Sequence, residues 1–308
     1  MGTPAFSVPS LEKIVECKNQ LELSIPLVVT SLDKPRRNRR GFPQPTPVKA
    51  KAISLGIPVF EVEDLKSSYF FEKLRDIKPD VIIVVAFRIL PKEVFSIPTK
   101  GIFNLHASLL PKYRGAAPIQ WAIINGDKAT GVTTFFLEEK VDVGSIILQH
   151  SLDVLPNESG SELSLRLSQL GANAVIETLE KIKSNKYELT AQNPDLATKA
   201  PKLTKENTKI NWNQPAIRVH NFIRALSERP TAWTLFNKKQ LKIFRSALVT
   251  DTLSTNTANI GEWRIEKNRI FVTCQNKSEI EICELQMEGK NRMTANEFAK
   301  GARLSNIP

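Results

Sequence analysis

The sequence is poor in cysteine and histidine and has no long apolar run. Its three cysteines form no Cys-x-x-Cys pair, so the sequence indicates neither a disulfide framework nor a zinc site. A reducing cytoplasm is the expected compartment. No apolar stretch reaches the roughly 18 residues of a membrane span, so none is expected. The first residues lack the basic start and apolar run of a secretory signal, and we expect none.

Two further kinds of signature are missing. The 13 glycines form neither a G-x-x-x-x-G-K loop nor a G-x-G-x-x-G loop, so no phosphate or dinucleotide loop is predicted. No nucleophile elbow with an ordered Ser, Asp and His is present, which leaves covalent catalysis unsupported.

Positive charge is abundant and unevenly placed. The net charge is +11, and Asp33–Lys51 carries seven Lys or Arg against one Asp. Leu203–Pro308 carries seventeen Lys or Arg against ten acids, which leaves the remainder slightly acidic. This concentration favours a polyanionic partner, most simply a nucleic acid, over the alternative of a solvated basic surface.

The first 183 residues alternate between two kinds of segment. Short β-branched runs bounded by Pro, Gly or charges predict strands at Ser24–Val29, Asp80–Ala86, Gly101–Leu105, Gly131–Leu137 and Ile147–Val154. Helices are predicted at Val8–Cys17, Pro47–Leu55, Tyr69–Ile77, Pro91–Phe95, Ala117–Asn125 and Ser159–Ile182, the last capped by Ser159 or Ser161. The alternation predicts an α/β domain, 1–183, with a doubly wound, mostly parallel sheet covered on both faces.

The rest of the chain has a different character. Residues 184–207 are polar without a clear period and are interpreted as a linker. A helix at Ala216–Leu226 and five short strands follow, which predicts a small antiparallel barrel within a domain at 208–308. The strands are expected at Ala232–Phe236, Gln240–Leu248, Ile260–Ile265, Arg269–Cys274 and Glu279–Met287.

The N-terminal sequence MGTPAFSVPSLEKI is typical of the turn and helix that follow a first strand. Thr3 is a candidate N-cap and Pro4 suits the first helical position. No strand precedes them, although a sheet of this kind normally begins with a central one. Unpaired buried ladder groups cost roughly 1–3 kcal/mol each. We therefore expect the cellular protein to begin upstream of Met1.

Asn104 and His106 form the main candidate for chemistry. Residues at i and i+2 of a strand point to the same face, and ligands bind at the C-terminal strand edge of open α/β sheets. An amide and an imidazole there can hold a developing oxyanion and move a proton. Asp142, in a loop with Gly144, is the candidate partner of the imidazole, whereas packing or surface roles are expected for His150 and His220. A strand-end histidine with only a structural role is the alternative.

Several motifs point to a family. NLHASLLPKYRGAAPIQ (Asn104–Gln120), the preceding VVAFRILP and a downstream Asp-x-Gly resemble the 10-formyltetrahydrofolate-dependent formyltransferases. GTPAFS, DKP with PVKAKA, RGAAPIQWAIINGD and IRALSERPTAW are similar to the branch of that family that formylates initiator methionyl-tRNA for translation initiation. The resemblance covers essentially the whole chain.

The resemblance implies the formyltransferase fold, here without its first strand, joined to a C-terminal OB-like β-barrel domain that binds tRNA. It implies that Asn104, His106 and Asp142 are catalytic and that 10-formyltetrahydrofolate donates the formyl group. No metal is needed, no membrane is expected, and no protein partner is implied. Folate contacts are implied for Phe87, Arg88, Ile89, Leu90, Ser108, Leu109, Leu110 and Pro111. Contacts with initiator methionyl-tRNA are implied for Arg36, Arg37, Arg39, Arg40 and Lys49.

The chain departs from the family pattern at Lys140, where a Gly is usual, and at Ser145, where an acid is common. Two other functions stay open. A formyltransferase of a small amine, such as a nucleotide or sugar, would need neither basic region. A non-catalytic RNA-binding protein on a truncated enzyme fold would have no reason to keep a folate site.

Overall fold

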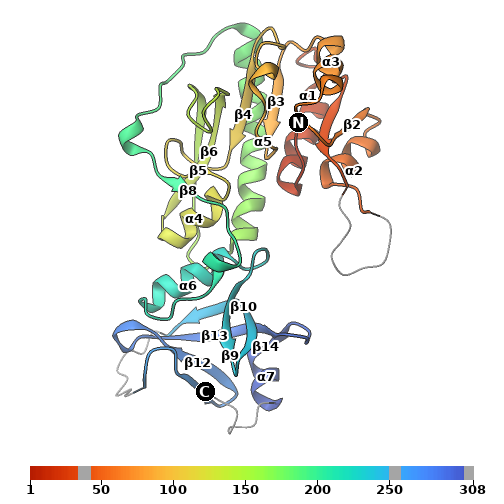
Figure 1. The fold of residues 1–308 in the computed structure, drawn as a ribbon. Helices are drawn as coiled ribbons and strands as arrows, with labels where there is room; N and C mark the ends of the chain where they lie inside the picture. Colours follow the sequence, from red (N-terminus) through yellow and green to blue (C-terminus); the bar gives the residue numbers. More distant parts are fainter. Residues whose placement is uncertain (34–42, 250–257, 302–308) are drawn as a thin grey trace. The chain divides into compact units, whose positions relative to one another are not determined.

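The computed structural model describes residues 1–33, 43–249 and 258–301. The chain forms two units (Figure 1). The first contains 1–115, 129–153 and 164–199, and the second contains 116–128, 154–163 and the chain from residue 200 onward. Helix α5 (Gly160–Ser184) contributes its first turn to the second unit and the rest to the first.

Two short sheets lie wholly within the first unit. Their strands are β1 (Val28–Ser31), β2 (Val59–Val62), β3 (Ile82–Val85), β4 (Ile102–His106), β6 (Ala129–Phe136) and β7 (Ile146–Asp153). The two-residue strand β5 (Arg114–Gly115) pairs with β8 (Lys199–Ala200). β1 pairs with β2 and β3 with β4, both in parallel, whereas β6 and β7 are antiparallel to their neighbours in the order β3-β4-β6-β7. The parallel arrangement thus holds for β1 to β4. The turn that returns β6 directly to β7 makes that pair antiparallel.

Helices cover these strands. α1 (Val8–Cys17), α2 (Pro47–Ser54) and α3 (Ser68–Ile77) form close to where the sequence predicts them, and the segment predicted as a helix at Pro91–Phe95 is a short 3₁₀ helix, Lys92–Val94. α5 runs along one face of β4 and β6 (Figure 1), where Thr178 of α5 bonds Thr134 of β6 at 2.7 Å. Because α5 covers the face of β4 that carries Leu105, Asn104 and His106 lie on the opposite face.

A gap separates β1 from β3. Gly2 donates its N–H to the Val29 carbonyl at 3.1 Å, and Val85 donates to the Met1 carbonyl at 2.9 Å. Met1 and Gly2 therefore form the end of a parallel ladder between the two strands. Beyond them lies a cavity of about 190 Å³ with mostly apolar walls that include Leu11, Ile14, Leu27, Ile83 and Leu179. In the part of the chain described, only this short segment bridges the two sheets.

The second unit is built on an antiparallel sheet, as predicted. Its strand order is β11-β12-β13-β10-β9, with the short β14 on β13. Register shifts around Phe244 in β10 increase the local twist. The elements are α4 (Pro118–Asn125), α6 (Ala216–Ala225), β9 (Ala232–Phe236), β10 (Lys239–Leu248), β11 (Trp263–Glu266), β12 (Arg269–Thr273), β13 (Glu279–Met287), β14 (Met293–Thr294) and α7 (Ala295–Gly301).

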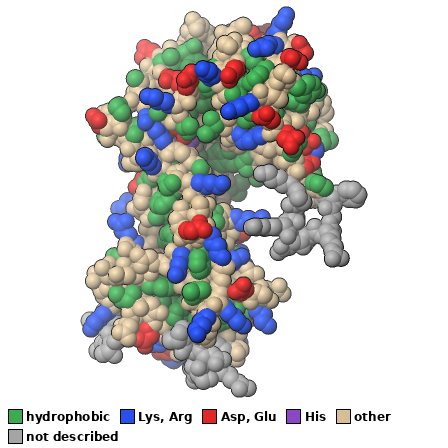
Figure 2. Space-filling model, viewed as in Figure 1, with side chains coloured by type: hydrophobic (Ala, Val, Ile, Leu, Met, Phe, Trp, Pro, Cys, Tyr) green, Lys and Arg blue, Asp and Glu red, His purple; other side chains and the backbone are tan. Residues whose placement is uncertain are grey.

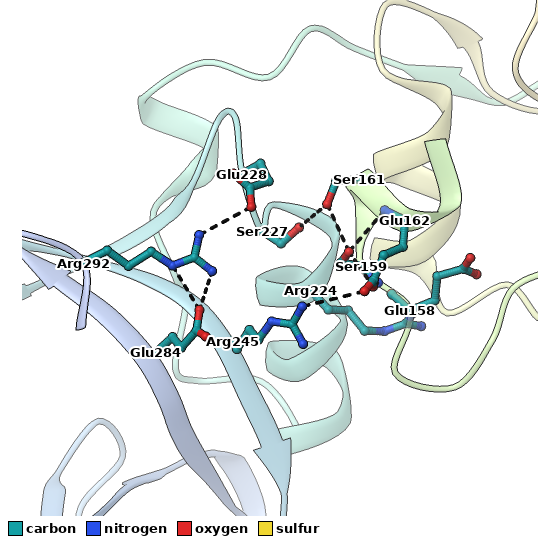
Figure 3. Close-up of polar contacts among 10 residues, drawn as sticks. All are labelled: Glu158, Ser159, Ser161, Glu162, Arg224, Ser227, Glu228, Arg245, Glu284 and Arg292. Atoms are coloured by element: carbon teal, nitrogen blue, oxygen red, sulfur yellow. Dashed lines mark hydrogen bonds and ion pairs between the residues drawn. The ribbon is translucent and has the colours of Figure 1, made fainter. Parts of the chain in front are cut away.

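A polar network in the second unit holds the start of α5 (Figure 3). Ser159 accepts a hydrogen bond from the Glu162 N–H at 3.2 Å, and Glu162 accepts from the Ser159 N–H at 2.8 Å. This reciprocal pair is a capping box, so Ser159 is the cap that the sequence predicts. Arg224 of α6 donates to the Glu158 carbonyl at 2.7 Å, which ties α6 to the same turn.

No helix among the described residues has the length and apolar character needed to cross a membrane. Likewise, these residues contain no group of three or more His, Cys, Asp or Glu placed to hold a metal ion. Cys17, Cys274 and Cys283 are all free thiols.

Candidate active site

The imidazole of His106 is fixed by one strong contact. Its Nε2 lies 2.9 Å from the carbonyl oxygen of Tyr113, and the side chain is buried. A carbonyl can only accept, so Nε2 carries the proton and Nδ1 is the basic nitrogen of the neutral ring. Nδ1 lies 3.9 Å from Oδ2 of Asp142. The predicted His106 and Asp142 are therefore brought together, with Nδ1 facing the carboxylate.

Asp142 is held in a strained turn. Its φ is +56°, a left-handed conformation that is uncommon for residues other than glycine, although Asp adopts it more readily than most. Its Oδ2 accepts a hydrogen bond from the Gly115 N–H at 2.9 Å. Gly144 follows closely, and a Cβ there would lie 1.7 Å from the Phe136 carbonyl oxygen. This close approach explains the glycine two residues after the aspartate.

Asn104 lies two residues before His106 on β4 and is partly exposed. In the part of the chain described, its carboxamide has no hydrogen-bond partner. The alternation of β4 places Asn104 and His106 on one face, at the C-terminal end of a strand whose neighbours β3 and β6 are both paired. An unengaged amide donor beside an oriented imidazole can serve a substrate oxygen.

The loop after β4 is anchored through Thr133 of β6. The Thr133 hydroxyl donates to the Ser108 carbonyl at 2.6 Å and accepts from the Leu110 N–H at 3.1 Å and from Gln149 Nε2 at 2.9 Å. Ser108 and Leu110 are buried, and Leu109 is partly exposed. Ser108 is the one polar side chain of the predicted folate loop Ser108–Pro111, and its hydroxyl donates to the Lys112 carbonyl at 2.6 Å.

The second predicted folate loop, Phe87–Leu90, follows β3. β3 and β4 are parallel, so this loop and the loop after His106 leave the same sheet edge. The Arg88 guanidinium donates to the backbone carbonyls of Val62 and Glu63, so its charge holds the loop to the end of β2. Ile89 is 73% exposed, whereas Leu90 is buried.

The predicted tRNA residues divide into two groups. Arg36, Arg37, Arg39 and Arg40 lie outside the described residues. Lys49 bonds Asp33 at 2.5 Å and Glu61 at 2.8 Å, and hydrogen bonding to Asp33 and then Glu61 raises the pKa of its ammonium. Asp33 also accepts from the Thr46 N–H at 3.1 Å. Lys49 therefore ties together residues on both sides of the arginine-rich segment.

Some basic side chains of the second unit pair with glutamates, and others carry uncompensated charge. Figure 2 shows Lys and Arg side chains spread over its visible surface, with acidic side chains between them. Arg245, Arg264, Arg269 and Arg292 each pair with a glutamate, so lysines carry much of the uncompensated charge. Lys205 and Lys209 both lie over the Trp233 ring, 5.7 Å and 5.8 Å from its centroid.

The other two histidines have the packing and surface roles that the sequence predicts. His150 of β7 contacts Glu177 of α5 at 2.6 Å on the surface. His220 of α6 is buried, its Nδ1 lies 3.0 Å from the Ser246 hydroxyl, and burial lowers its pKa to about 4.

Several residues that build the site were not predicted. Gln192 bonds the Asp142 turn and accepts from Arg114, while Thr133 and Gln149 bond the loop after His106. Gln192 lies in an irregular segment, where periodicity gives no signal. Thr133 and Gln149 lie on strands, where a polar residue alone does not reveal its partner.

Comparison with known proteins is consistent with this geometry. Residues 7–179 match the formyl transferase family model, and residues 202–303 match the model for the formyl transferase C-terminal domain. The structure of the N-formyltransferase from Helicobacter canadensis in complex with folinic acid and dTDP-3-aminofucose shares the fold. It aligns with a TM-score of 0.68 over 93% of this chain and 97% of that chain, at 22% identity.

Curated relatives are more similar in sequence. A methionyl-tRNA formyltransferase from Chlorobium phaeovibrioides is 50% identical over 98% of this chain and 94% of its own length. Another, from Agathobacter rectalis, is 40% identical over 99% of this chain and 96% of its own length. The chain therefore belongs to the formyltransferase family and, within it, to the methionyl-tRNA formyltransferases.

Proposed function

We propose that the chain transfers the formyl group of 10-formyltetrahydrofolate to the α-amino group of methionine on initiator tRNA. The observation that carries the proposal is the position of Asn104 and His106 on one face of β4, with Asp142 3.9 Å from the imidazole. The relatives named above, which cover nearly the whole chain, support the choice of acceptor.

The proposed reaction proceeds through a tetrahedral intermediate. The neutral α-amine attacks the formyl carbon, which forms a C–N bond and places negative charge on the formyl oxygen. The Asn104 amide donates to that oxygen, and a protonated His106 supplies a second donor. The intermediate collapses as the bond between the formyl carbon and N10 of the folate breaks, and the proton lost by the amine reaches N10. Asp142 supports His106 while the ring carries the proton.

The geometry assigns separate tasks to the two ring nitrogens. Nε2–H is committed to the Tyr113 carbonyl, so it orients the ring. Nδ1 is therefore the nitrogen that exchanges a proton. The Asp142 carboxylate lies close enough to it to stabilise a charged imidazolium. Because Gly115 N–H also bonds that carboxylate, Asp142 cannot rotate freely toward other partners.

For the folate, we propose a site formed by Phe87–Leu90 and Ser108–Pro111. Both loops leave the same sheet edge, and the internal bonds of Thr133 and Arg88 hold their backbones in place. Exposed backbone groups can pair with the edge of a pterin ring, while Ile89 offers apolar surface to it. The proposal needs no metal ion, since the two donors alone stabilise the developing charge.

For the tRNA, we propose phosphate and base contacts by Arg36, Arg37, Arg39 and Arg40, because arginine presents a planar fork of donors. Lys49 bonds Asp33, just before that segment, and belongs to the same proposed tRNA-binding region. The exposed lysines of the second unit supply the sequence-independent part of the affinity. The Arg39→Ala chain is expected to bind tRNA more weakly with a shallower salt dependence. A wild-type salt slope would remove Arg39 from phosphate contact.

A formylation assay with purified components tests the proposal. The chain is incubated with 10-formyltetrahydrofolate and, in parallel, with initiator methionyl-tRNA, elongator methionyl-tRNA or a dTDP-amino sugar. Formylation of the initiator tRNA alone is the expected result. Formylation of the sugar instead would support a small-amine enzyme, and tRNA binding without any transfer would support a non-catalytic RNA-binding protein.

A further inference from the structure

Residues 186–199, here called the return segment, run back over the first unit after α5. The segment has little regular structure, only the 3₁₀ helix Pro194–Leu196 and the start of β8 (Lys199–Ala200). Its exchange of backbone hydrogen bonds between Thr190 and Ile146, at 2.8 Å and 3.0 Å, fixes it to β7. Most of its side chains are exposed, so polar contacts rather than core packing define its path.

Gln192 is the residue through which this segment reaches the site. Its Nε2 donates to the carbonyl oxygens of Asp142 at 3.0 Å and of Gly144 at 2.9 Å. Both amide hydrogens are therefore used on the one turn that holds Asp142 at its positive φ. A strained backbone persists only where its surroundings hold it, and these two bonds act directly on the strained turn.

Arg114 sets the orientation of the Gln192 amide. The Gln192 Oε1 accepts from Arg114 Nε at 3.1 Å and from Nη2 at 2.7 Å. A guanidinium only donates and carbonyls only accept, so the amide cannot be flipped without losing bonds at both ends. Arg114 also directly precedes Gly115, whose N–H holds the Asp142 carboxylate. The neighbouring residues Arg114 and Gly115 thus fix both parts of Asp142: Arg114 fixes its backbone through Gln192, and Gly115 fixes its carboxylate directly.

We propose that Gln192 is a positioning residue that, oriented by Arg114, holds the Asp142 carboxylate at its working distance from His106. The inference rests on the proposed function, because it acts through Asp142. Among the described residues, the hydrogen bonds of Gln192 go to Arg114, Asp142 and Gly144, and none goes to a predicted folate residue. Its loss is expected to lower kcat and to leave KM for both substrates nearly unchanged, because a small displacement of a catalytic group slows turnover more than it weakens binding.

The test compares kcat and KM for three single variants. Gln192→Leu removes all four bonds, and kcat is expected to fall about tenfold to a hundredfold. Gln192→Glu keeps an acceptor for Arg114 but turns an acceptor toward the two carbonyls, so a similar fall is expected. Asn193→Ala is the matched control, because Asn193 caps only its own 3₁₀ helix by accepting from Asp195 N–H at 2.9 Å. Wild-type kcat in Gln192→Leu, or full activity in Gln192→Glu, would overturn the proposal.

A double variant separates this inference from the proposed function. If Gln192 acts through Asp142, adding Gln192→Leu to Asp142→Ala should cause little further loss. If the kcat losses of the two single variants multiply in the double variant, Gln192 acts by another route. That result overturns the inference while the catalytic role of Asp142 stands. Wild-type turnover in Asp142→Ala alone would instead contradict the proposed function.

Discussion

Two regions of the first unit satisfy the hydrogen-bonding needs of the backbone in opposite ways. Around His106, side chains bond the carbonyl and N–H groups of irregular turns: Thr133 holds 108–110, and Gln192 holds 142–144. Between β1 and β3, Met1 and Gly2 pair with both strands only at one end, and an apolar cavity follows. The first region is fixed by specific polar bonds, whereas the second depends on apolar packing and a short ladder.

The difference suggests that activity and stability have separate origins in this unit. β4 carries the site and is fully flanked by β3 and β6, so the gap lies on the far side of β3. Changes at the polar turns should reduce catalysis while folding is retained. Changes at the gap should alter the free energy of unfolding with little effect on kcat.

The largest effect is expected from Asn104→Ala. Removing one donor to a developing oxyanion typically lowers kcat by about 10²–10³. The Asn104 side chain makes no hydrogen bond to described residues and is partly exposed, so the thermal midpoint and the tRNA Kd should stay near wild type. Single-turnover formylation measures the rate, a filter-binding titration measures the Kd, and thermal unfolding measures the midpoint. Undiminished turnover would exclude Asn104 from oxyanion stabilisation.

At the gap, the expected effect is on stability and depends on pH. In a chain that begins at Met1, burial lowers the pKa of the terminal amine from 8.0 to about 5. The unfolded chain therefore binds more protons between these pH values, and stability rises with pH through that window. From pH 6 to pH 8 the gain from this group is about 2 kcal/mol, measurable by urea unfolding at fixed ionic strength.

An engineered extension provides the control for this pH effect. Other residues lining the cavity have no titratable side chain. Six β-branched apolar residues added before Met1 would move the amine away and pair with β1 and β3, so the pH effect should vanish and stability should rise. Six Gly and Ser residues would also move the amine away, and so remove its titration. Their small side chains would fill the cavity poorly. Equal stability of the two extended chains would show that the gap does not accept a strand.

Thr133→Val tests the polar turns around His106. It removes the hydroxyl that joins Ser108, Leu110 and Gln149. We expect KM for 10-formyltetrahydrofolate to rise about tenfold, which corresponds to about 1.4 kcal/mol. Thr134→Val is the matched control, because that hydroxyl bonds Thr178 of α5 on the other face at 2.7 Å. Both variants should lose stability, but only Thr133→Val should change KM. Equal KM values would separate the loop from the folate site.

What the sequence could predict differs between these regions for physical reasons. The shared face of Asn104 and His106 could be predicted because strand alternation fixes which side chains point the same way. β13 and α1 have the predicted bounds because their apolar patterns are regular. β2 was missed because Val59–Val62 is short and only its last residue is buried.

The contacts of Gln192 with Asp142 and Gly144 could not be predicted, because they join segments about 50 residues apart. Such contacts depend on the tertiary path of an irregular chain and leave no periodic signal.

The smallest expected effect concerns Ile89, which is 73% exposed in the loop after β3. If the folate ring covers part of this side chain, Ile89→Ser should raise KM for the folate about fivefold, because burying half of an isoleucine contributes about 1 kcal/mol. Ile53→Ser on α2 is the matched control, since Ile53 is 60% exposed and lies outside both predicted folate loops. Neither change should affect the thermal midpoint. Equal KM values in the two variants would place the folate away from Ile89, and the catalytic edge would then bind its donor through backbone groups alone.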